Sequence, residues 1–87
     1  MFWVYVIRSV TSGKLYKGST DNLERRLAEH NKTGANKYYT SNKGPWELVY
    51  LEKYETRAEA MARENFFKSG KGRLILKEIL SRQQREN

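Results

Sequence analysis

Apolar residues recur along the chain in two patterns, one typical of strands and one typical of helices. Three stretches rich in aromatic and β-branched residues predict strands, over residues 2–8, 14–20 and 46–54. Three others predict helices, over residues 21–32, 56–68 and 73–82, because apolar residues recur there three or four positions apart. The order β-β-α-β-α-α predicts an α+β domain. Its first strand is apolar on both alternating sets, which indicates a central strand.

Local signals mark where two of the helices begin and end. Asp21 with Glu24, and Thr56 with Glu59, have the spacing of a capping box at a helix start. Residues 69–72, Ser-Gly-Lys-Gly, predict a break between the last two helices. We therefore expect the last two helices as separate elements.

The chain predicts one domain over residues 1–82, followed by a tail at 83–87 that frays. Residues 34–45 show no period and predict a long loop. Lys37 and Lys43 alternate there with Tyr38 and Tyr39. Lysines hold phosphates and aromatic rings stack on bases, so this loop is a candidate nucleic-acid contact, although a plain connection is an equal alternative.

Composition narrows the classes of function. The chain has 87 residues with 17 Lys and Arg against 10 Asp and Glu, a net charge of +7 that favours nucleic acid as a partner, although it is also compatible with solubility alone. There is no Cys, which excludes a disulfide scaffold and a thiolate zinc site. Residues 1–7 form the longest apolar run, too short for a membrane span. The chain start lacks signal-peptide features, so we expect a cytoplasmic protein with no membrane partner.

Four residues form a candidate catalytic group. If position 7 of the first strand faces Tyr16, then Tyr5 lies diagonally from Tyr16 on the same face of the sheet. On the first helix, Arg26 and His30 share the arc of the buried leucines. An Arg fork suits a phosphate and a His can move a proton near neutral pH. The structural alternatives are packing tyrosines, an Arg at the edge of the core and a His bonded to the backbone.

Glu64 is the candidate metal ligand. It flanks the buried stripe of the second helix. Mg²⁺ is often held by only one or two carboxylates, with water and substrate phosphate as the other ligands. The alternative is a surface ion pair with Lys68 four residues on.

Taken in order, these residues resemble the GIY-YIG nuclease family. Residues 3–5 (Trp-Val-Tyr) stand where that family has GIY, and residues 16–18 (Tyr-Lys-Gly) stand where it has YIG. Arg26 and His30 match the helix that follows, and Glu64 matches the metal-binding Glu. The resemblance covers nearly the whole chain. It is closest to the small single-domain members and extends to the nuclease module of bacterial nucleotide-excision repair.

The resemblance implies a three-stranded antiparallel sheet flanked by helices. It also implies an endonuclease that uses Mg²⁺ or Mn²⁺ to cut DNA phosphodiesters, with structured or damaged DNA as a candidate substrate. The implied site consists of Tyr5 and Tyr16 as paired phenols, Gly18 as a close-approach glycine, Arg26 as a phosphate clamp, His30 as a proton-transfer or positioning group and Glu64 as the metal ligand. Arg25 and Lys68 are further candidate nucleic-acid contacts. A tyrosine base would need a lowered pKa, which nearby Arg26, His30 and the metal would favour, or would have to pass its proton on as the water loses its own. Which of Tyr5, Tyr16 and His30 takes the proton is left open.

The chain departs from the family pattern at three places. Trp3 replaces the first glycine of GIY, and Lys17 replaces the isoleucine of YIG. Family members often carry a late Asn, which residues 76–80 do not offer. A nucleic-acid-binding module that does not cleave is therefore a second function to test, and an interaction domain is a third. The oligomeric state (monomer or weak homodimer) and the pathway (DNA repair, recombination or defence against mobile elements) are left open.

Overall fold

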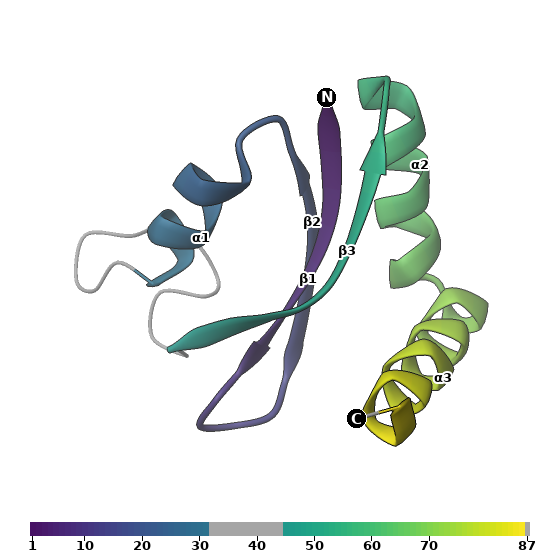
Figure 1. Ribbon diagram of the computed structural model, residues 1–87. Helices are drawn as coiled ribbons and strands as arrows, with labels where there is room; N and C mark the ends of the chain where they lie inside the picture. The colour runs from purple at the N-terminus through teal and green to yellow at the C-terminus, as the bar shows by residue number, and fades with distance from the viewer. Residues whose placement is uncertain (32–44, 87) are drawn as a thin grey trace.

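The computed structural model describes residues 1–31 and 45–86. The elements, in chain order, are β1 (Phe2–Ser9), β2 (Leu15–Thr20), α1 (Leu23–Asn31), β3 (Trp46–Tyr54), α2 (Arg57–Lys68) and α3 (Gly70–Glu86). This order confirms the predicted α+β fold. Helix α1 lies on one side of the sheet, and α2 and α3 lie on the other (Figure 1).

The sheet is antiparallel, with strand order β2-β1-β3. The central position of β1 confirms the prediction made from its two apolar faces. Ile7 pairs with Tyr16 and Arg8 with Leu15, which is the predicted register of the hairpin. Strand β2 therefore forms one edge of the sheet.

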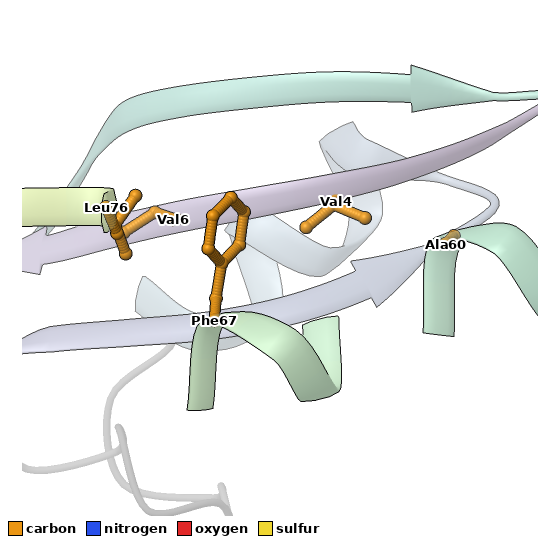
Figure 2. Close-up of a cluster of buried hydrophobic side chains, with 5 residues drawn as sticks. All are labelled: Val4, Val6, Ala60, Phe67 and Leu76. Carbon is orange, nitrogen blue, oxygen red and sulfur yellow. The ribbon is translucent and has the colours of Figure 1, made fainter. Parts of the chain in front are cut away.

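The larger core lies between β1 and the helices α2 and α3. Val4 and Val6 point from β1 toward Ala60, Phe67 and Leu76 (Figure 2). All five side chains are at most 1% exposed. Because successive strand residues point to opposite faces, this packing sends Tyr5 and Ile7 to the other side of the sheet.

The second core lies under α1. Tyr5, Ile7 and Trp46 are buried there and pack against Leu23 and Leu27, the two leucines that mark the inner face of α1. Burying this face fixes how α1 is rotated against the sheet. The rotation decides which of its charged residues face the strands.

A polar network fixes α2 against β3. The Arg63 guanidinium donates to Glu52 at 2.9 and 3.2 Å, and the hydroxyls of Tyr50 and Tyr54 donate to the same carboxylate at 2.5 and 2.7 Å. Burial alone would raise the pKa of Glu52, but these donors outweigh it and leave the pKa below its usual value. The network holds α2 in the position from which it presents Glu64.

The helix starts agree with the sequence in one case and differ in the other. Thr56 caps α2 through a bond from the backbone N–H of Glu59, as predicted. Helix α1 is capped by Asn22, whose Oδ1 accepts from the backbone N–H of Arg25 at 3.1 Å. The predicted cap at Asp21 is therefore wrong by one residue.

Helix α3 begins earlier and ends later than predicted. Only Ser69 separates α3 from α2. The Ser69 hydroxyl accepts a hydrogen bond from the backbone N–H of Gly72 and so caps the start of α3. A Cβ at Gly72 would collide with the backbone carbonyl of Phe66, so the tight junction needs a glycine. Residues 83–86, expected to fray, continue the helix because Gln, Arg and Glu are good helix formers.

Four of the candidate nucleic-acid contacts, Lys37, Tyr38, Tyr39 and Lys43, lie outside the described residues. Among the helices that are described, none combines the length and the apolar character needed to span a bilayer.

Candidate active site

A buried tyrosine and a buried histidine form the centre of the site. Tyr5 extends from β1 and His30 from the last turn of α1, and they are 0% and 1% exposed. The Tyr5 hydroxyl and His30 Nε2 share a hydrogen bond of 2.9 Å. His30 thus lies on the buried side of α1, as the sequence predicts.

Tyr16 completes a cluster of three rings. Its ring lies 6.4 Å from that of Tyr5 and 4.7 Å from that of His30, measured between centroids. Tyr16 stands on the edge strand β2 and is only partly buried. It is therefore the ring of the three that a substrate can reach most easily.

Burial keeps both Tyr5 and His30 neutral at pH 7. It raises the pKa of Tyr5 to about 12 and outweighs the Arg26 guanidinium, which lowers it. It also lowers the pKa of His30 to about 4, and the positive charge of Arg26 adds to the effect. The lowered pKa that a tyrosine base would need is thus not found at Tyr5, because desolvation is larger than the attraction to Arg26.

The shift at His30 predicts a pH-dependent stability. His30 takes up a proton near pH 6.5 in the unfolded chain, but only near pH 4 in the folded one. The unfolded state therefore binds more protons between these values, and stability falls as the pH drops through them. We expect a loss of about 2 kcal/mol between pH 7.5 and 5 in urea unfolding. The variant His30→Gln should lack this component. An identical pH slope in the variant would contradict the assignment.

Arg26 lies beside this cluster and is partly neutralised. Its guanidinium is close enough to the Tyr5 side chain to lower the pKa of that phenol, it pairs with Glu29 at 3.3 Å, and the Arg26 side chain is 22% exposed. Glu29 is not among the site residues named from the sequence, although its position three residues after Arg26 on a helix favours an ion pair between the two. Arg25 instead points outward, is 63% exposed and pairs with Asp21 at 3.7 Å.

Gly18 gives the Tyr5 ring its space. A Cβ at Gly18 would lie 2.6 Å from Tyr5 Cζ and closer still to the hydroxyl. Because Tyr5 is fully buried, its ring cannot move aside without disturbing His30.

The variant Gly18→Ala should therefore displace the Tyr5 ring. We expect a loss of about 1–3 kcal/mol in stability, with a break in the Tyr5–His30 hydrogen bond visible in the His30 ring resonances by NMR. Gly70→Ala is the matched control, since a Cβ there meets nothing within 4 Å. Unchanged His30 resonances in Gly18→Ala would contradict this account.

Glu64 belongs to α2, which lies on the opposite side of the sheet from α1 (Figure 1). Its Oε1 accepts from the Ser19 hydroxyl at 2.6 Å and its Oε2 from Lys68 Nζ at 2.7 Å. The ion pair with Lys68, kept open as an alternative, is thus present. Ser19 is not among the site residues named from the sequence. The one feature of the sequence that could have indicated it is that it follows Gly18, so that its side chain faces the opposite side of β2.

The two parts of the site meet at the edge strand β2. Gly18 faces the Tyr5 ring and the next residue, Ser19, holds Glu64. The negative charge of Glu64 also contributes to raising the pKa of Tyr5, after burial and the larger effects of its nearer neighbours. The site therefore extends across the β2 edge.

Comparisons with known proteins match this arrangement. A family model described as the GIY-YIG catalytic domain matches residues 1–77. The chain belongs to the GIY-YIG family. A UPF0213 protein of Clostridium perfringens is 41% identical over 68 residues, 78% of this chain and 71% of the relative. A UPF0213 protein of Staphylococcus haemolyticus is 38% identical over 80 residues, which cover 92% of this chain and 95% of the relative.

A solved structure supports the fold of this GIY-YIG chain. The solution NMR structure of a UPF0213 protein from Bacillus halodurans is similar with a TM-score of 0.54 and 29% identity, covering 91% of this chain and 85% of that one. Family and fold together give the chain a nuclease fold, and the GIY-YIG resemblance stated from the sequence is confirmed.

The residues of this GIY-YIG chain fit a divalent cation at Glu64. The described residues contain no group of three or more His, Asp or Glu side chains that could hold a metal by themselves. A single carboxylate is enough for Mg²⁺ when water and substrate oxygens complete the shell. Each Glu64 oxygen has a second lone pair, and Lys68, whose side chain is 49% exposed, can move away. Glu64 would therefore hold the cation and Lys68 would compete with it.

Proposed function

We propose that the chain is a divalent-metal-dependent endonuclease that hydrolyses phosphodiester bonds in DNA, with structured or damaged DNA as its substrate. One observation carries the proposal. A cluster of Tyr5, Tyr16 and His30 with Arg26 lies on one side of β2, and Glu64 reaches the same strand edge from the other side.

In this proposal Arg26 binds the phosphate under attack. A water oxygen forms a bond to phosphorus and loses a proton, while the bond from phosphorus to one bridging oxygen breaks and that oxygen takes up a proton from solvent to leave as an alcohol. Negative charge grows on the non-bridging oxygens in the transition state. The Arg26 guanidinium is charged, partly exposed and close to Tyr5, so it meets that charge when the phosphate competes with Glu29 for it.

The ring cluster receives the proton from the water. Tyr16 is the accessible ring and would position the water through its hydroxyl. His30 lies behind it and is neutral because its pKa is about 4, so it is in the form that can accept a proton. Tyr5 holds the His30 ring in place and keeps its own proton, since its pKa is about 12. His30 is thus the better candidate for the base.

Glu64 would hold the metal ion. When bound, a divalent cation supplies positive charge at the phosphate oxygens. The Ser19 hydroxyl, at 2.6 Å from Oε1, fixes the direction of the Glu64 carboxylate.

A second function has two observations in its favour. Both oxygens of Glu64 already have donors, Ser19 and Lys68, and the last helix offers no Asn at residues 76–80. A chain in which Lys68 keeps its place would bind nucleic acid through its net positive charge and cut nothing.

End-labelled oligonucleotides separate the two functions. Linear, flapped and branched DNA, with RNA of the same sequence, would be incubated with the protein in Mg²⁺, Mn²⁺ or EDTA. The nuclease proposal expects DNA fragments that appear only with metal. Gel shifts without fragments in every condition would favour the binding module.

A further inference from the structure

A groove lies between β2 and α3, on the side of the sheet that carries Glu64. Its volume is about 580 Å³, and its lining residues are Lys14, Leu15, Lys17, Arg73, Leu76 and Lys77. Four of the six carry a positive charge, and the two leucines form an apolar floor. None of them was a candidate in the sequence, because they come from two segments more than 50 residues apart.

The four cations of this groove have no anionic partner in the part of the chain that the structure describes. No carboxylate of the described residues lies within 4 Å of Lys14, Lys17, Arg73 or Lys77, whereas most other arginines there form ion pairs. Burial, followed by the charges of Arg73 and Lys68, lowers the pKa of Lys17. The fold thus keeps like charges together, at a cost that a bound anion would remove.

The position of Arg73 adds to this imbalance. The first turn of α3 contains no acidic residue and carries Lys71 and Arg73 instead. The N-terminus of a helix is its positive end, where acidic residues are stabilising and cations are not. The helix dipole and the side chains therefore attract negative charge to the same end of the groove.

The groove lies next to the candidate active site along β2. Lys17 precedes Gly18 on β2 and faces the same side of the sheet as Ser19, the residue that holds Glu64. Lys68, the ion-pair partner of Glu64, is close enough to affect the pKa of Lys17. A chain of phosphates bound at Glu64 would therefore pass into the groove.

We propose that this groove, with Lys14, Lys17, Arg73 and Lys77, binds the sugar-phosphate backbone of the nucleic-acid substrate next to the bond that is cut. The inference rests on the proposed function, since it places the groove beside that site. Spaced cations match the regular spacing of backbone phosphates, and they give affinity without sequence preference. The groove would thus supply substrate binding in a domain of only 87 residues.

The salt dependence of binding tests the proposal without any cutting. Fluorescence anisotropy of a labelled DNA duplex would be measured in EDTA, from 50 to 300 mM salt, with the wild type and with Arg73→Ala/Lys77→Ala. Each phosphate contact contributes a slope of about 0.9 in log K against log salt. We expect the double variant to lose about 1.5–2 units of slope and roughly 100-fold in affinity at 50 mM salt.

Two control variants make the result specific. Lys53→Ala/Arg57→Ala removes the same charge at the opposite end of the sheet, where Lys53 faces Trp3, and should change the slope by less than about 0.5. Arg73→Lys/Lys77→Arg keeps the charge and should keep the slope. Equal losses in both alanine variants, or no loss in either, would overturn the proposal.

A competitor identifies the ligand. Poly-glutamate with as many charges as the duplex would be titrated into the complex of the protein with the labelled duplex. We expect weak competition that is unaffected by Arg73→Ala/Lys77→Ala. Competition equal to that of unlabelled DNA, and lost in this variant, would overturn the assignment to nucleic acid in favour of an acidic peptide. Because binding is read in EDTA, a failure of cutting leaves this result unaffected.

Discussion

Replacing Glu64 with Gln should abolish metal-dependent cutting. The amide keeps the shape of the side chain and can still accept from the Ser19 hydroxyl, but it lacks the charge that holds a divalent cation. Loss of the several kcal/mol that a metal supplies corresponds to a rate decrease of roughly 10³-fold or more. The measurement is single-turnover cleavage of a labelled oligonucleotide at saturating protein.

The matched control for this variant is Glu78→Gln. Glu78 also pairs with a cation four residues on, Arg82 at 2.7 Å, but lies on α3 with a side chain that is 61% exposed. We expect it to cut at the rate of the wild type. Both variants should bind DNA in EDTA with nearly unchanged affinity. Cutting by Glu64→Gln at the rate of the control would show that the metal is held elsewhere.

Replacing Arg26 with Ala should slow the chemical step by about 10²–10³-fold, the loss typical of a missing charge-stabilising group in a transition state. The Arg26 guanidinium lowers the pKa of Tyr5 and so lies near its ring, whereas the neighbouring Arg25 points outward to Asp21. The rate at saturating protein would fall, while the affinity measured in EDTA would change much less.

Two variants accompany Arg26→Ala. Arg26→Lys keeps the charge without the planar fork and should recover only part of the rate. Arg82→Ala removes an exposed arginine from α3 and should leave the rate unchanged. An Arg26→Ala protein that cuts as fast as Arg82→Ala would show that Arg26 serves only the packing of α1.

The α1 side of the site could be predicted from the sequence because it depends on local geometry. A short hairpin restricts the pairing of its strands, so the register that brings Tyr5 and Tyr16 to one face followed from a single assumption. Helical periodicity then placed Arg26 and His30 on the buried side of α1. Both inferences needed only residues close together in the chain.

The other side of the site depends on contacts between distant residues. The bond from Ser19 to Glu64 joins residues 45 positions apart, and no spacing rule gives it. The same holds for the groove, in which Lys17 meets Arg73. Burial, which raises the pKa of Tyr5 to about 12, is likewise a property of the folded chain, so the charge state of the rings could not be predicted from residue types.

The most direct test of the proposed function is the nicking of supercoiled plasmid by the purified wild-type chain in Mg²⁺ or Mn²⁺ against EDTA. The site described at the β2 edge predicts nicked circles that appear before linear DNA, and only when metal is present. The Glu64→Gln protein, purified in the same way, should give none. No nicking with either metal, together with a gel shift that weakens steeply with salt, would contradict the nuclease assignment.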